Sequence, residues 1–108
     1  MNYEILRTDD FSRHLKQLSK KYPSIKSDYS EFLISLQWDP TQGTALGKNC
    51  YKIRMKITSK KTGKSGGARV ITYVKIEMKR ITLLDIYDKS EKDTISDKEL
   101  LALLKKVQ

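Results

Sequence analysis

Cysteine and long apolar runs are scarce in this sequence, and each scarcity excludes a class of protein. The one cysteine, Cys50, cannot form an internal disulfide, which excludes a disulfide-stabilised scaffold and fits a reducing compartment. No run approaches the ~18 apolar residues of a membrane-spanning helix, and the N-terminus lacks a signal pattern. We therefore expect a cytoplasmic protein with no membrane attachment. Its 108 residues suffice for one hydrophobic core, so we expect a single domain over residues 1–108.

Side chains that bind metals or act as nucleophiles are equally few. The one histidine, His14, has no cysteine or aspartate partner at the spacing of a metal site or a catalytic triad, so we expect a surface histidine. Cys50 begins an alternating apolar pattern and is expected in the core. Residues 63–65 lack the earlier glycine of a phosphate-binding loop, and residues 88–99 have a lysine where a calcium loop needs a ligand. The sequence predicts no metal and no other cofactor.

Acidic residues are almost absent from residues 48–80. Glu77 is the one acid in that window, which holds eleven lysines and arginines and has a net charge of +10, whereas the rest of the chain has −1. Charge confined to one part of a chain indicates a surface that binds a polyanion. No basic amphipathic helix accompanies it, so nucleic acid is a better partner than a membrane. We predict that four lysines in the segments around the expected strands bind RNA, and these are Lys48, Lys60, Lys61 and Lys64.

Residues 50–57 alternate strictly between apolar and basic side chains. In a β-strand, Tyr51, Ile53, Met55 and Ile57 would face a core, and the opposite face would carry the cations Lys52, Arg54 and Lys56. Arg69 follows a Gly-Gly-Ala turn at the start of the next expected strand. If the two strands pair antiparallel, Arg69 would join the cations and form an anion site on the sheet. A plain solvated sheet face remains the alternative.

The remaining patterns predict an α+β fold with the element order β-α-α-β-β-β-α. We expect a short edge strand at 2–7, a helix capped by Thr8, a second helix from a Ser24 cap to Trp38, and a loop at 40–48. The sheet would be a meander of strands at 50–57, 69–76 and 81–87. A capping box formed by Ser96 and Glu99 would begin the last helix. Helices packed on one sheet face would leave the other face free for the cations.

Four segments together resemble a known family. Residues 50–56 (CYKIRMK), 61–65 (KTGKS), 66–73 (GGARVITY) and 83–92 (LLDIYDKSEK) are similar to the RelE/ParE superfamily of bacterial type II toxins, most of all to its RelE and HigB-like branch. This resemblance covers most of the chain. It implies a small, antiparallel-rich twisted sheet with two N-terminal helices and a C-terminal helix. It also implies cleavage of messenger RNA, usually in the ribosomal A site, and neutralisation by a co-expressed antitoxin protein.

The resemblance also implies site residues. Lys52, Arg54 and Lys56 match basic strand positions of the family, Arg69 matches the arginine after the glycine turn, and Lys89 falls near a further basic position. Where the best-known RelE member has a C-terminal tyrosine, this chain has Thr94-Ile95, and Tyr87 is the candidate substitute. Metal-independent cleavage by the RNA's own 2′-hydroxyl would need phosphate-stabilising cations, a base and an acid. Arg54 and Arg69 fit the first role, Lys52 or Lys56 the second, and Lys89 or Tyr87 the third or a stacking role.

Two other functions remain open on this pattern. The same basic face would suit a module that binds RNA or the ribosome without chemistry. ParE-like members of the superfamily poison DNA gyrase instead. The row formed by Lys52, Arg54 and Lys56 with Arg69 argues against that branch, because ParE-like chains tend to lack it.

Overall fold

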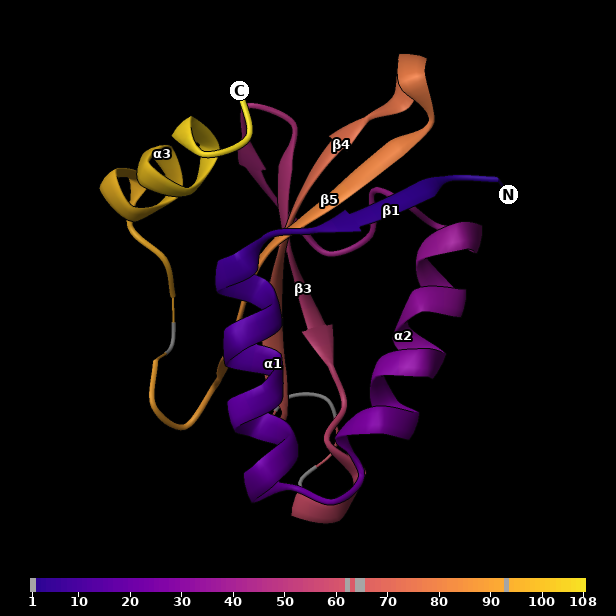
Figure 1. Cartoon of the computed structure of the whole chain (residues 1–108), viewed down its shortest axis with the longest axis vertical. Coiled ribbons are helices and arrows are strands. Elements are labelled where there is room, and N and C mark those ends of the chain that lie inside the picture. The colour runs from indigo at the N-terminus through magenta and orange to yellow at the C-terminus, as the bar shows by residue number, and fades with distance from the viewer. Residues whose placement is uncertain (1, 62, 64–65, 93) are drawn as a thin grey trace.

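A mixed β-sheet forms the centre of the molecule in this computed structural model, which describes residues 2–61, 63, 66–92 and 94–108. Within those residues the sheet has five strands in the order β1-β5-β4-β3-β2 (Figure 1). β1 is parallel to β5, and every other neighbouring pair is antiparallel. The strands are β1 (Glu4–Arg7), β2 (Thr44–Gly47), β3 (Cys50–Met55), β4 (Ala68–Lys75) and β5 (Arg80–Asp88).

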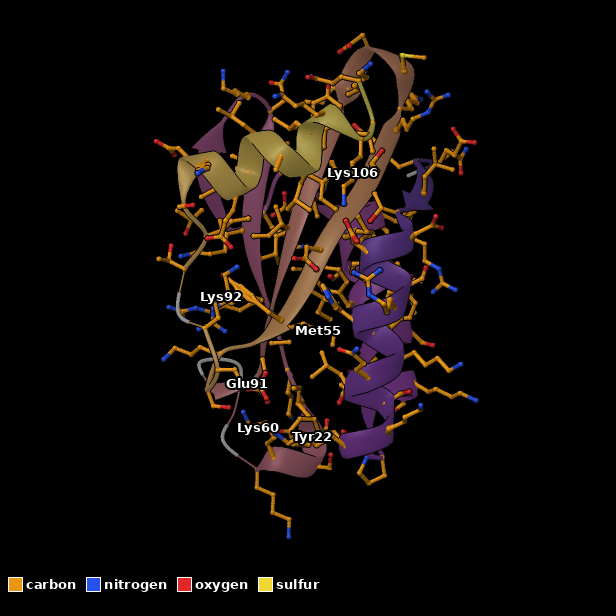
Figure 2. The ribbon with its side chains drawn as sticks, turned by 60° about the vertical axis from the view of Figure 1, so that its left-hand side comes forward. Tyr22, Met55, Lys60, Glu91, Lys92 and Lys106 are labelled. Atoms are coloured by element: carbon orange, nitrogen blue, oxygen red, sulfur yellow. The ribbon has the colours of Figure 1, made fainter. Side chains whose placement is uncertain are left out.

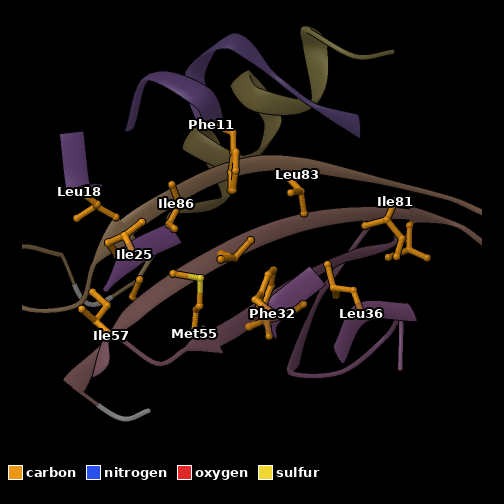
Figure 3. Close-up of a cluster of buried hydrophobic side chains, with 14 residues drawn as sticks. Phe11, Leu18, Ile25, Phe32, Leu36, Met55, Ile57, Ile81, Leu83 and Ile86 are labelled. Carbon is orange, nitrogen blue, oxygen red and sulfur yellow. The ribbon is translucent and has the colours of Figure 1, made fainter. Parts of the chain in front are cut away.

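Two N-terminal helices cover one face of the sheet. α1 (Asp9–Lys21) begins as predicted, because the Thr8 side chain accepts a hydrogen bond from the Phe11 amide at 3.0 Å. α2 (Ile25–Trp38) follows after a short turn, but Ser24 does not cap it with its side chain as predicted. The Ser24 hydroxyl donates to Asp28 instead. The buried side chains of both helices pack on inward-facing residues of β3, β4 and β5 (Figure 3). This core includes Phe11, Leu18, Ile25, Phe32 and Leu36 from the helices, and Ile53, Met55, Leu83 and Ile86 from the strands.

The third helix covers part of the opposite face. α3 (Asp97–Lys105) begins with the predicted capping box of Ser96 and Glu99. Leu100 and Leu104 form a second buried cluster with residues of the sheet, which are Cys50, Ile71, Tyr73 and Leu84. The expectation that all helices share one face was therefore wrong. β4 is apolar on both sides and its first seven residues are buried, so the second face needs a cover of its own. The helix α3 provides part of it, on the side away from α2 (Figure 1).

The strand β2 was also missed, since residues 40–48 were predicted to be a loop. Thr44 pairs with Lys52 and Ala45 with Tyr51, and the connecting residues Lys48 and Asn49 both have positive φ, at 55° and 63°. Positive φ at both central positions suits the tight hairpin turn that matches the natural twist of paired strands. The α+β class is confirmed, and the observed order is β-α-α-β-β-β-β-α.

Two further features of the backbone affect the candidate site. The pairing of β4 with β5 shifts between Ile71 and Thr72, where Leu84 is an extra residue on β5. Short 3₁₀ turns follow β3 at Thr58–Lys60 and β4 at Ile76–Met78. Among the described helices, none has the length and apolar character needed to cross a membrane.

Candidate nucleic-acid interface

The strand register aligns the predicted site residues in rows across the sheet. Arg54 of β3 pairs with Arg69 of β4, and Arg69 pairs in turn with Tyr87 of β5. Directly paired residues point to the same face, with Cβ atoms about 5 Å apart. Arg54, Arg69 and Tyr87 therefore form one row, and Lys52 lies in the next row on the same face. The predicted meeting of Arg69 with the cations of β3 is confirmed in position, while the role of each residue remains a prediction.

The two arginines of this row differ in exposure. Arg54 is exposed, whereas Arg69 is 5% exposed and its Nη1 donates a 3.1 Å hydrogen bond to the Ala68 carbonyl. Arg54 is thus the more accessible guanidinium of the row. Arg69 lies beneath the surface, where the lower dielectric strengthens electrostatic interactions.

Tyr87 and Lys89 lie where β5 leaves the sheet. Tyr87 is half-buried, and the Lys92 ammonium lies 5.3 Å from its ring centroid. The Lys89 amide donates to the Gly67 carbonyl at 3.0 Å, which ties the residue after β5 to the turn before β4. A side chain at Gly67 would place its Cβ 2.3 Å from the Met55 carbonyl oxygen, so this close approach requires glycine. Lys89 is thereby held beside the row of Arg54, Arg69 and Tyr87.

Lys56 is exposed just beyond the end of β3, beside a turn that is anchored by Asp28. The Asp28 carboxylate is buried and accepts hydrogen bonds from the Thr58 amide at 2.9 Å, the Thr58 hydroxyl at 2.6 Å and the Ser24 hydroxyl at 2.7 Å. Burial alone would raise the pKa of Asp28, but these hydrogen bonds outweigh burial and lower it. The anchored turn fixes the backbone that carries Lys56.

Lys60 is bound within the fold rather than presented to a ligand. Its ammonium lies 2.9 Å from Asp88 Oδ1 and 5.6 Å from the Tyr22 ring centroid, and its side chain is 13% exposed (Figure 2). Asp88 also accepts hydrogen bonds from the Tyr22 hydroxyl at 2.7 Å and from the Ser90 amide and hydroxyl at 2.9 and 2.7 Å. Burial raises the pKa of Asp88, and these donors reverse that effect and lower it far below the usual range. The predicted RNA contact of Lys60 therefore competes with a structural ion pair.

The other predicted RNA-binding lysines do not form one group. Lys48 lies in the β2–β3 turn, which precedes the start of β3, whereas Arg54 lies near the end of that strand. Lys61 is exposed after the 3₁₀ turn that follows β3, at the other end of that strand. Lys64 lies outside the described residues. The basic window is thus divided between the two ends of the sheet, and the site residues gather at one of them.

The structure adds a pair that sequence reasoning missed. His14 Nδ1 lies 2.6 Å from Asp85 Oδ1, although the two residues are 71 positions apart. His14 was expected at the surface without an aspartate partner. Its side chain is 35% exposed, but the lack of a partner was wrong. The available signal was Asp85 itself, a single acid within the apolar strand Ile81–Tyr87.

The thiol of Cys50 is not a candidate nucleophile. Cys50 is buried, and burial raises the pKa of its thiol to about 11, so it does not provide a thiolate at neutral pH. Within the part of the chain that the structure describes, no three histidine, cysteine, aspartate or glutamate side chains come together to hold a metal ion. The groups available for chemistry at this site are therefore its cations, Tyr87 and the pair of His14 with Asp85.

Comparison with known proteins identifies the fold. No family model matches the sequence. A mutant of the E. coli toxin RelE in the free state superimposes with a TM-score of 0.62 at 16% identity and covers 100% of both chains. The intact E. coli RelBE toxin–antitoxin complex gives a TM-score of 0.61 at 14% identity and covers 81% of this chain and 96% of the other. The isolated E. coli RelE toxin gives 0.57 at 18% identity over 99% and 100% of the two chains. The chain therefore has the RelE fold.

Proposed function

We propose that this protein is the toxin of a type II toxin–antitoxin system and a cytoplasmic endoribonuclease that cleaves messenger RNA on the ribosome. The observation that supports this most is the row of Arg54, Arg69 and Tyr87, with Lys52 beside it, on a sheet with the RelE fold. The row combines guanidinium groups that suit a phosphate with a ring that suits a base.

The proposed chemistry uses the RNA's own 2′-hydroxyl as nucleophile. The 2′ oxygen attacks the adjacent phosphorus, and the bond from phosphorus to the 5′ oxygen breaks. Arg54 binds the phosphate oxygens directly, while Arg69 supports the developing negative charge from beneath. The ammonium groups of Lys52 and Lys56 add positive charge or accept the 2′ proton. Lys89 protonates the departing 5′ oxygen, because the hydroxyl of Tyr87, the other predicted acid, is buried. Tyr87 also offers a surface on which a base can stack.

An antitoxin is the proposed protein partner. The RelBE structure contains a toxin together with its antitoxin, and this chain covers 96% of the matched chain. A partner with an acidic or amphipathic segment would complement a domain whose net charge is +9. Such a segment would lie over the basic face or along the helices.

Induction of the protein in bacteria, with the 5′ ends of cellular RNA mapped before and after, tests the proposal. Wild type is compared with Arg54→Gln and with Lys79→Gln, which removes one exposed positive charge at the other end of the sheet. We expect growth arrest and new ends inside translated codons for wild type and Lys79→Gln, and neither for Arg54→Gln. Arrest without new ends would point to gyrase or to ribosome binding, and absence of arrest would refute the toxin assignment.

A further inference from the structure

The contact between His14 and Asp85 has the geometry of an oriented imidazole. His14 lies on α1 and Asp85 on β5, and Asp85 Oδ1 accepts both from His14 Nδ1 at 2.6 Å and from the Ile86 amide at 2.9 Å. A carboxylate can only accept hydrogen bonds, so Nδ1 carries the proton. In the neutral ring, Nε2 then has a free lone pair and can accept a proton. A carboxylate that fixes the tautomer in this way is a common support for a catalytic histidine.

The pair borders the face that carries the proposed RNA site. Asp85 pairs with Ile71 in the row that also contains Lys52, and Tyr87 is two residues further along β5 on the same face. Side chains at this spacing on one strand stand about 7 Å apart. His14, Asp85, Tyr87 and Lys92 all line one cavity of about 330 Å³ between α1 and the segment after β5. His14 and Tyr87 thus border the same cavity, and the Tyr87 hydroxyl itself is buried.

Charged groups around the imidazole are largely paired with one another. Lys92 is ion-paired with Glu99, and Lys21 lies 3.5 Å from Glu91. Asp10 is paired with Lys106 at 2.5 Å and with Arg13 at 2.8 Å. Asp85 is therefore the charged group in direct contact with the ring. His14 also borders a second cavity, between α1 and α3. The other titratable groups that line the two cavities are Asp10, Lys21, Tyr87, Glu91, Lys92 and Glu99.

We propose that His14 is the general base of the RNA cleavage and that Asp85 is its positioning residue. This inference rests on the proposed function and names the base within it. Nε2 takes the proton of the 2′-hydroxyl as the 2′ oxygen bonds to phosphorus. The bond to the 5′ oxygen breaks, and that oxygen takes a proton from the Lys89 ammonium. The products are a 2′,3′-cyclic phosphate and a 5′-hydroxyl end, and Lys52 and Lys56 remain charged to stabilise the phosphate.

The assignment of His14 as general base is tested by measuring the rate of RNA cleavage. The purified protein acts on messenger RNA on programmed ribosomes between about pH 5 and pH 9. The variants are His14→Ala, His14→Gln and Asp85→Asn, with Gln17→Ala as control because Gln17 lines the same cavity. We expect both His14 variants to lose about a hundredfold or more in rate, and the acidic limb of the pH profile to disappear with them. Added imidazole should restore part of the activity of His14→Ala. Asp85→Asn should lower kcat with little change in KM and should shift that limb.

The outcomes separate this inference from the proposed function. If Arg54→Gln is inactive while His14→Gln keeps the wild-type rate and pH profile, the His14 assignment is overturned and the ribonuclease stands. If wild type makes no cuts, both fall together. His14→Gln retains a donor for Asp85, so it keeps the test valid even where His14→Ala does not fold. Thermal unfolding of each variant identifies that case.

Discussion

Two aspartates on β5, three residues apart, have opposite environments. Asp88 lies on the hydrophobic core side of the sheet and accepts from Lys60, Tyr22 and both donors of Ser90. Asp85 points to the other face, is half-buried, and accepts from His14 and the Ile86 amide. The donors to Asp88 are side chains and an amide that hold neighbouring segments together. Asp85 instead binds Nδ1 of the His14 imidazole and leaves Nε2 out of this contact. The number and origin of the donors therefore distinguish a carboxylate that holds the fold together from one that is free to take the positioning role that we propose.

The largest expected effect is the loss of stability when the Asp88 carboxylate is removed. Asp88→Ala leaves the Lys60 ammonium without its buried partner, and removal of one member of a buried ion pair costs about 3–5 kcal/mol. Urea unfolding of Asp88→Ala beside Asp85→Ala measures the difference. We expect the Asp85 variant to be destabilised by about 1 kcal/mol, as for one hydrogen-bonded group at a partly exposed site. Equal destabilisation would remove the contrast between the two residues.

The next effect is on catalysis, at the surface guanidinium. Arg54→Gln should reduce the rate of RNA cleavage about a hundredfold or more, because the variant has no oriented charged donor for the phosphate. Its stability should stay near that of wild type, since Arg54 is exposed. Lys79→Gln, with the same change in net charge, should cleave at the wild-type rate. A similar fall in rate in both variants would indicate a general effect of net charge.

Acid unfolding should reveal the structural role of Asp88. The pKa of Asp88 is lowered in the folded protein, so ionised Asp88 stabilises the fold fully above the pKa of an unfolded aspartate, about 3.9. That stabilisation declines as the pH falls below this value and is lost at the folded-state pKa. Asp88→Asn should therefore flatten the fall in unfolding free energy below about pH 4, with a residual slope from the other carboxyl groups of lowered pKa, which are Asp28, Asp10 and Glu99. Urea unfolding at a series of pH values measures the slope, and an unchanged slope in Asp88→Asn would contradict this expectation.

The smallest expected effect concerns two neighbouring lysines. Lys61→Gln should weaken RNA binding and reduce the slope of log affinity against log salt by about one, because the variant neutralises one phosphate fewer. Lys60→Gln should leave that slope unchanged and lower stability instead, because its ammonium is bound to Asp88. RNA binding over a series of salt concentrations measures the slope, and urea unfolding measures stability. A reduced slope for Lys60→Gln and an unchanged slope for Lys61→Gln would contradict these roles of the two lysines.

Local patterns in the sequence predicted what depends on neighbouring residues. The alternation of 50–57 predicted the two faces of β3, and the glycine turn predicted the place of Arg69 beside Arg54. The Thr8 cap and the capping box of Ser96 were also predicted, because caps depend on residues within one turn of a helix. The strand β2 was missed because its residues, Thr-Ala-Leu-Gly, carry little β-strand signal and pair only through a turn with positive φ.

Packing between distant elements was less accessible to sequence reasoning. The contact of His14 with Asp85 depends on how α1 lies against β5, and no spacing in the sequence encodes it. The same is true of Lys60, whose partner Asp88 lies 28 residues away. The apolar character of 70–74 on both sides of the strand was the available signal for a cover on the second face. We nevertheless expected that face to be free, and α3 covers part of it.

The extra residue Leu84 on β5 determines which side chains reach the candidate site. From Ile81, an uninterrupted strand would place residues 81, 83, 85 and 87 on one face. Ile81 and Leu83 are in the core, so Asp85 and Tyr87 would be driven into it as well. The irregularity at Leu84 reverses the alternation, which places Ile86 and Asp88 on the core side and returns Asp85 and Tyr87 to the face of Arg54. One extra residue thus offsets the alternation of the strand by one position, and Asp85 and Tyr87 lie on the same face as Arg54 because of it.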